Sequence, residues 1–190
     1  MYKRPFDIFV SLGALLILAP VIAVAWLGAA IDTRSSGIFS QQRIGRFGKP
    51  FNIIKLRTMR EGFPKTVSSF GKFIRTSKID ELPQFLNVLA GDMSLVGPRP
   101  DIAGYYDRLE GDQRKILELR PGITSEASIK YRDEERLLQA QPDPLKFNDE
   151  VIFPDKVRMN LEYYHCRGLM RDIEIIIRTV TGYLKPGQHG

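Results

Sequence analysis

The stretch IFVSLGALLILAPVIAVAWLGAAI, residues 8–31, contains no charged residue. As a continuous helix it would extend about 36 Å, which is enough to cross a hydrocarbon core of about 30 Å. We therefore expect it to form a membrane helix, and this expectation decides the class of fold.

Three arrangements of this stretch compete. A cleaved signal peptide is conceivable, because Lys3 and Arg4 precede the stretch and Ala23-Val24-Ala25 resembles a cleavage site. The stretch is long for a signal peptide, however, and nothing downstream looks stapled by disulfides. The other two arrangements are a straight spanning helix and a re-entrant helix that returns to the face it entered.

Flanking charge and one proline favour the re-entrant helix over residues 1–31. Basic residues lie before the stretch, at Lys3 and Arg4, and again after it, from Arg34 onward. Because positive charge favours the cytoplasmic side, both ends should lie on that side. Pro20 removes a backbone hydrogen bond in the middle of the stretch, so we expect the helix to break there.

Composition narrows the class of partner. The 190 residues carry 28 Lys+Arg against 22 Asp+Glu, a net charge of +6, which indicates an anionic partner. Nucleic acid fits poorly, because aromatic and basic residues do not interleave along one segment. One cysteine, Cys166, excludes an intramolecular disulfide, and two histidines are too few for a zinc site. Any metal should be an oxygen-ligated ion such as Mg²⁺.

Two motifs suggest phosphoryl chemistry. In Lys78-Ile79-Asp80-Glu81-Leu82-Pro83, adjacent carboxylates precede a proline that suits a helix start, where the helix dipole favours negative charge. An ionised Asp80 is a possible nucleophile, and Glu81 can bind a cation or move a proton. Arg99 stands between Pro98 and Pro100, so a stiff backbone presents its guanidinium for phosphate binding. An ordinary acidic helix start explains the first motif equally well.

Hydrophobic periodicity predicts a mainly α fold with a small β-hairpin, of the α+β class. The hairpin should pair residues 38–44 with residues 51–57, where Lys55 and Arg57 share one face of the strand. Helices are expected over residues 67–79, 82–89, 105–119, 156–164 and 169–184. The last has an apolar stripe that suits core packing, a dimer seam or a membrane-facing side. It is formed by Leu169, Ile173, Ile176, Ile177 and Val180, and Ile175 widens it.

Residues 71–100, which include Asp80-Glu81-Leu82-Pro83-Gln84 and Gly97-Pro98-Arg99-Pro100, resemble the core of the bacterial sugar transferase family. Its small monotopic members are phosphoglycosyl transferases. Residues 51–59 and Pro121-Gly122-Ile123-Thr124 resemble further family motifs, so the resemblance extends over nearly the whole chain. Ser125 departs from the family's usual glycine, and the stretch after it differs from that of many members.

The resemblance implies a membrane enzyme. Such an enzyme transfers sugar-1-phosphate from a UDP-sugar to a polyprenol phosphate (undecaprenyl phosphate), releasing UMP, as the first membrane step of bacterial glycoconjugate and polysaccharide synthesis. It would be monotopic, on the cytoplasmic face of the inner membrane, with interfacial amphipathic helices in contact with membrane lipid. We expect one domain over residues 1–190, with a compact catalytic region at 32–184 and a frayed tail at 185–190. A homodimer stays open.

The resemblance also assigns roles to residues. Asp80 would attack the phosphorus that carries the sugar and form an aspartyl-phosphosugar intermediate. Asp80 and Glu81 would hold Mg²⁺, and the substrate-binding residues would be Arg75, Arg99, Pro100, Lys55 and Arg57. The rival from another class is a non-catalytic, membrane-tethered module that binds anionic lipid. It explains the net charge and the apolar stretch but gives no reason for Asp80-Glu81.

Overall fold

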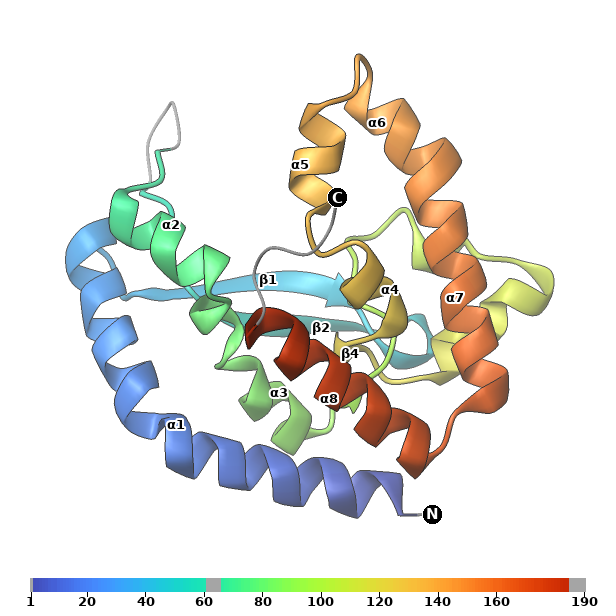
Figure 1. Cartoon of the computed structure of the whole chain (residues 1–190), viewed down its shortest axis with the longest axis horizontal. Helices are drawn as coiled ribbons and strands as arrows, with labels where there is room; N and C mark the ends of the chain where they lie inside the picture. Colours follow the sequence, from blue (N-terminus) through green and yellow to red (C-terminus); the bar gives the residue numbers. More distant parts are fainter. Residues whose placement is uncertain (1, 61–65, 185–190) are drawn as a thin grey trace. The chain divides into compact units, whose positions relative to one another are not determined.

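The structure is a computed structural model that describes residues 2–60 and 66–184. It confirms a mainly helical chain with small sheets and an apolar helix at its N-terminus (Figure 1). The chain forms two compact units, one from residues 1–43 and 50–93, the other from residues 44–49 and 94–190. The expectation of a single domain stays a prediction, and the tail at 185–190 lies outside the described residues.

The first unit contains the apolar helix, the predicted hairpin and two short helices. Its elements are α1 (Lys3–Thr33), β1 (Ile38–Ile44), β2 (Pro50–Leu56), α2 (Ser69–Thr76), the 3₁₀ turn η2 (Ile79–Glu81) and α3 (Gln84–Ala90). β1 and β2 form a two-stranded sheet, as the alternating pattern predicted. α3 ends at Gly91, whose φ of 97° is a left-handed conformation that glycine adopts without strain.

Helix α1 is long and apolar enough to cross a membrane, and only 11% of its most apolar window is buried inside the protein. A core helix of a soluble protein would be mostly covered. Large side chains such as Leu16 and Ile17 are instead more than 70% exposed. The helix continues through Pro20, and Figure 1 shows that its two halves point in different directions.

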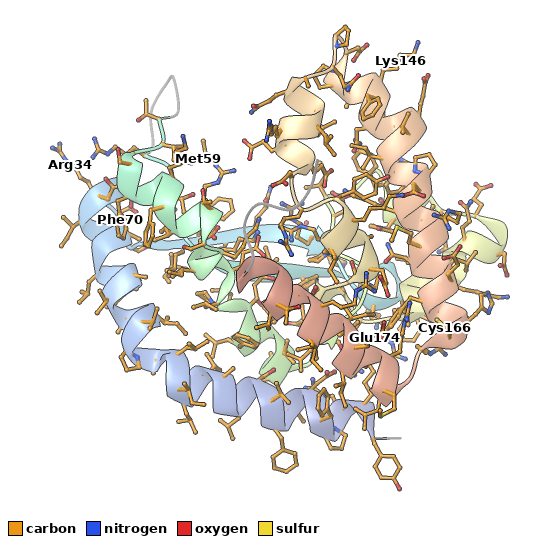
Figure 2. All side chains as sticks on the ribbon, in the orientation of Figure 1. Arg34, Met59, Phe70, Lys146, Cys166 and Glu174 are labelled. Atoms are coloured by element: carbon orange, nitrogen blue, oxygen red, sulfur yellow. The ribbon has the colours of Figure 1, made fainter. Side chains whose placement is uncertain are left out.

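One narrow face of α1 packs against the rest of the first unit. Its buried residues have small or polar side chains and recur about every fourth position: Asp7, Ser11, Ala25, Ala29 and Thr33. Near the C-terminal end, Phe70 of α2 lies toward α1 (Figure 2), so close that a Cβ added to Gly28 would come within 2.5 Å of its ring. Ala25, Ala29, Leu56 and Ile74 form the apolar core of this contact. Helix α1 therefore has two kinds of surface: large apolar side chains on its exposed side, and small or polar side chains on the side that packs against the first unit.

The second unit contains short helices around a two-stranded parallel sheet. Its elements are η1 (Arg46–Gly48), β3 (Ser94–Val96), η3 (Tyr106–Arg108), η4 (Gly111–Glu118), β4 (Gly122–Thr124), α4 (Glu126–Lys130), α5 (Glu134–Gln139), α6 (Pro144–Phe147), the π-helical turn η5 (Asn148–Ile152), α7 (Phe153–Cys166) and α8 (Leu169–Leu184). Its apolar core consists of Tyr106, Leu109, Ile116, Leu117 and Val157.

Two predictions in this unit need correction. Residues 105–119 are not one α-helix but two 3₁₀ segments, because Leu109 is extended and Gly111 has a φ of 55°. In α8, the buried positions are Asp172 and Ile175, at 1% and 0% exposure, whereas Ile177 and Val180 of the predicted stripe are 55% and 54% exposed. The centre of the core-facing side therefore lies nearer Ile175 than the predicted stripe, which leaves a dimer seam or a membrane-facing side open for the exposed residues.

The parallel pairing of β3 with β4 was not predicted. Ser94 pairs with Gly122 and Val96 with Thr124. A Cβ on Gly97 would collide with the carbonyl oxygen of Arg120, and one on Gly122 would collide with the backbone of Gly97. Gly97 and Gly122, one in each of two family motifs, are therefore required because the two backbones approach too closely for any side chain.

Candidate active site

The two predicted carboxylates lie in a short helical turn between α2 and α3. Lys78 has a left-handed φ of 58° and reverses the chain after α2, and η2 then carries Asp80 and Glu81. Leu82 and Pro83 have right-handed helical angles and lead directly into α3. Residues 79–90 therefore form one nearly continuous helical run, and the acidic pair precedes the helix as predicted.

Burial dominates the environment of Asp80. Its side chain is 8% exposed, and Oδ1 is buried with no hydrogen-bond partner in the described part of the chain. This burial, followed by the neighbouring charge of Glu81, raises the pKa of Asp80 to about 6, against opposing effects of Lys55, Lys78 and Arg75. Burial therefore opposes the preference of a helix start for the ionised form of Asp80. At pH 7 about nine in ten molecules would still carry the charge.

Glu81 has a cationic partner from the hairpin. Lys55 Nζ, on β2, lies 3.0 Å from Glu81 Oε1, and the two side chains are only 18% and 11% exposed. The structure thus brings Lys55 to the acidic pair, where it binds a carboxylate. Arg75 comes from α2, and its charge is among those that oppose the raised pKa of Asp80. Arg57 donates a hydrogen bond from Nε to the carbonyl oxygen of Ile38, at 3.3 Å.

Asn87 fixes the strand that carries Lys55. Its Nδ2 donates to the carbonyl oxygen of Asn52 at 2.8 Å, and its Oδ1 accepts from the N–H of Ile54 at 3.0 Å. The side chain is only 3% exposed. One amide on α3 thereby binds the backbone of β2 on either side of Ile53. These two hydrogen bonds fix the position along α3 of the strand that carries Lys55.

Arg4 ties the start of α1 to the end of α3. Its Nη1 donates to the carbonyl oxygen of Val88 at 2.6 Å and its Nη2 to that of Leu89 at 3.2 Å. Both carbonyls lie at the C-terminal end of α3, where the helix dipole places partial negative charge, so a cation is favourable there. The carbonyl oxygen of Val88 also accepts from the N–H of Gly91 at 3.1 Å, and Arg4 is its second donor. The sequence indicated Arg4 only as a signal of topology, and its contact with α3 was not predicted.

The inner face of the helical run is polar. Asp80, Gln84 and Asn87 are all buried there, together with Val88. Their spacing of i, i+4, i+7 and i+8 places them on one side of a helix. Gln84 is 2% exposed, and its Nε2 is buried with no partner among the described residues. Polar residues recurring at core-facing spacing were the sequence signal that could have identified Gln84 and Asn87.

Arg99 and Pro100 belong to the second unit, immediately after β3. Arg99 is exposed and Pro100 is buried. The N–H of Gly122 donates to the carbonyl oxygen of Pro98 at 2.9 Å, which stitches the Arg99 loop to β4. This hydrogen bond ties the residue before Arg99 to β4, and the phosphate-binding role of Arg99 stays a prediction.

A divalent ion would have few protein ligands at this site. In residues 2–60 and 66–184, no three side chains of His, Cys, Asp or Glu gather in a way that could hold a metal. Mg²⁺ commonly binds one or two carboxylates and takes its remaining ligands from substrate phosphates and water. The adjacent carboxylates of Asp80 and Glu81 fit that donor set.

Comparison with known proteins gives a consistent result. A family model described as bacterial sugar transferase matches residues 1–186. The chain is 33% identical to a UDP-glucose:undecaprenyl-phosphate glucose-1-phosphate transferase of Caulobacter vibrioides, over 96% of this chain and 69% of that protein. It is 33% identical to the exopolysaccharide production protein PSS of Rhizobium leguminosarum, over 98% and 96%. A putative undecaprenyl-phosphate N-acetylgalactosaminyl 1-phosphate transferase of Bacillus subtilis is 38% identical, over 60% and 76%.

Proposed function

The chain belongs to the bacterial sugar transferase family and is a phosphoglycosyl transferase, and from this premise we propose that it transfers sugar-1-phosphate from a UDP-sugar to undecaprenyl phosphate. The products are a diphosphate-linked lipid sugar and UMP. Relatives named for this reaction with glucose and with galactose support the substrate class and leave the sugar open. The rival lipid-binding module explains no feature that the enzyme leaves unexplained.

The observation that carries the mechanism is a buried carboxylate in an acidic pair. Asp80 is 8% exposed, so few water molecules solvate it, and a poorly solvated carboxylate is a stronger nucleophile. An oxygen of Asp80 attacks the phosphorus that bears the sugar. The bond from this phosphorus to the bridging oxygen breaks, and its electron pair leaves with UMP. An oxygen of undecaprenyl phosphate then attacks the same phosphorus and releases Asp80.

The surrounding cations bind the anionic substrates. Lys55, Arg75 and Arg57 supply positive charge, and Arg99, between Pro98 and Pro100, binds phosphate as the family motif implies. When bound, Mg²⁺ would neutralise charge on the diphosphate, with Asp80 and Glu81 as its protein ligands. Glu81 is already ion-paired with Lys55, so its carboxylate is positioned before substrate arrives.

We place the enzyme on the cytoplasmic face as a monotopic protein with a re-entrant α1. Both ends of α1 are bonded to the same unit, which supports this topology. Near its start, Arg4 binds the carbonyl oxygens at the end of α3. Near its end, Asp32 accepts hydrogen bonds from Arg60 at 3.1 Å and from Ser68 at 2.6 Å. A straight spanning helix would put these two ends on opposite sides of the bilayer.

Single cysteines test the topology. In a Cys166→Ser background, Lys3→Cys and Ser36→Cys should both react with a membrane-impermeant thiol reagent from the same side of sealed vesicles. Labelling from opposite sides would establish a spanning helix. In intact vesicles and in detergent-opened vesicles, the Cys166→Ser protein without an added cysteine gives the background.

Intact mass tests the reaction. Purified protein is exposed to Mg²⁺ and a panel of UDP-sugars without acceptor, and then to undecaprenyl phosphate. We expect an adduct of one phosphosugar that the lipid acceptor discharges and that Asp80→Asn does not form. Lipid product without an adduct would mean direct transfer, with Asp80 limited to binding. Identification of the donor that gives the adduct would name the sugar.

A further inference from the structure

Two buried polar atoms near the reacting centre have no partner. Asp80 Oδ1 is a hydrogen-bond acceptor and Gln84 Nε2 is a donor, and neither forms a hydrogen bond within the described residues. The two side chains are 8% and 2% exposed. A buried polar group without a partner costs about 1–3 kcal/mol, so two such groups in one short segment call for an explanation.

The chain places these complementary groups one helical turn apart. Residues 79–81 form η2, Leu82 and Pro83 keep helical angles, and α3 begins at Gln84. Residues i and i+4 of a helix lie on the same face, and a glutamine and an aspartate at this spacing commonly form a hydrogen bond. Asp80 and Gln84 both face inward, as does Asn87 one turn further on.

Neither atom is accessible to a partner from solution. Both Oδ1 and Nε2 are buried as atoms, not only as residues. A substrate phosphate or a water molecule therefore reaches neither without displacing protein, whereas the two side chains start one helical turn apart on the same face. Hydrogen bonds at active sites are often long before substrate binds and shorten in the reactive complex.

We propose that Gln84 is a positioning residue whose amide N–H binds Oδ1 of Asp80 and so presents Oδ2 as the attacking oxygen. Asp80 owes its remaining exposure to atoms other than Oδ1, which leaves Oδ2 on the side from which substrate arrives. The hydrogen bond removes rotation about the Cβ–Cγ bond. It also leaves the unbound oxygen aligned for bond formation with phosphorus, and such alignment lowers the barrier of a displacement reaction. This inference rests on the proposed covalent mechanism.

Gln84→Met tests it, because methionine has a similar length and no N–H. Removal of an unpaired buried amide should leave the melting temperature unchanged or raise it. The rate constant for adduct formation at saturating UDP-sugar should fall about 10- to 100-fold, the usual effect of losing a hydrogen bond to a charged group. The UDP-sugar concentration at half-maximal rate should stay within about twofold of wild type, because the residue does not contact the donor.

Two further variants test the role of the N–H group and provide a control. Gln84→Glu keeps the shape and polarity but replaces the N–H group with oxygen, so it should be at least as slow as Gln84→Met. Gln139→Met, at an exposed position at the end of α5, should match wild type in every measurement.

The outcomes separate cleanly. A slow Gln84→Met that melts no lower than wild type and keeps its half-maximal concentration supports the proposal. An unchanged rate overturns it, as does a raised half-maximal concentration with an unchanged maximal rate, which would mean that Gln84 binds donor. A large loss of stability would mean that the amide has a structural partner, which also overturns it. If the wild-type protein makes lipid product and no adduct, the covalent mechanism itself fails, and this is visible before any variant is compared.

Discussion

Replacing Asp80 with asparagine should abolish adduct formation and yet make the protein more stable at neutral pH. Asparagine keeps the size of the side chain and removes its charge. Burial raises the pKa of Asp80 from 3.8 to about 6, which means that folding disfavours the charged form. The enzyme therefore loses stability to keep an ionised carboxylate at its reacting centre.

The pKa gives the magnitude and the pH range. Well below pH 3.8 the carboxyl is neutral in both the folded and the unfolded chain, so it costs nothing. As pH rises through 4 to 6 the unfolded chain ionises first, and wild-type stability falls relative to Asp80→Asn. A shift of about two units at 1.4 kcal/mol each corresponds to a difference of up to about 3 kcal/mol above pH 7. For a chain of this size that is roughly 5–10 °C in melting temperature.

Thermal unfolding of both proteins in the same detergent, at a series of pH values from 4 to 8, measures this difference. Asp155 provides a control of opposite sign. It accepts bonds from Lys130 at 2.6 Å and Tyr131 at 2.7 Å, and hydrogen bonds including one from Arg158 hold its pKa below the ordinary value. Asp155→Asn should therefore lower stability at neutral pH.

The reasoning is refuted if the difference between wild type and Asp80→Asn does not change with pH, or if wild type is the more stable protein at pH 7.5. Either result would mean that burial does not disfavour the charge on Asp80. If Asp155→Asn and Asp80→Asn changed thermal stability in the same direction, the cause would be a general effect of removing negative charge from a chain of net charge +6.

Three other substitutions test the supporting contacts. Lys55→Met removes a charge that lowers the pKa of Asp80, so the acid limb of the rate against pH should move to higher pH; a limb that stays in place would contradict the contact with the acidic pair. Asn87→Leu removes the side-chain partners of two backbone groups of β2 and should cost about 1–3 kcal/mol in denaturant unfolding together with most activity, whereas a stable, active variant would show that β2 is held by other contacts. Arg4→Met should lose about 1.5–3 kcal/mol of stability in the same assay, with Lys72→Met, at an exposed position of α2, as a control of equal charge change. Equal losses for the two would refute a specific role of Arg4 at the end of α3.

Local patterns were enough for much of the fold. α8 spans Leu169–Leu184 as predicted, the hairpin forms where alternation predicted it, and α3 ends at Gly91. Each of these depends on side chains a few residues apart or on the conformation of one glycine. The prediction failed over residues 105–119, where η3 and η4 replace an α-helix. There the positive φ of Gly111 and packing onto Val157 of α7 override helix-forming composition.

The candidate site was predicted in part. The positions of Asp80 and Glu81 before a helix, and of Lys55 on a strand, were expected from the motifs. That Lys55 binds Glu81, that Asn87 holds β2, and that burial raises the pKa of Asp80 were not. The burial of Gln84 was not predicted either, although its helical spacing from Asp80 and Asn87 was a signal for it.

The sequence by itself determined that an apolar helix precedes a basic region. A run of residues without charge and an excess of Lys and Arg can both be recognised before the chain folds. It also determined the order of chemical groups along the chain. Only the tertiary structure decided which of these groups meet. Arg4 reaches Val88 across 84 positions and Lys55 reaches Glu81 across 26. Burial and electrostatic interaction depend on distance in space, so the charge state of Asp80 and the partner of Glu81 exist only once β2, α2 and α3 have packed together.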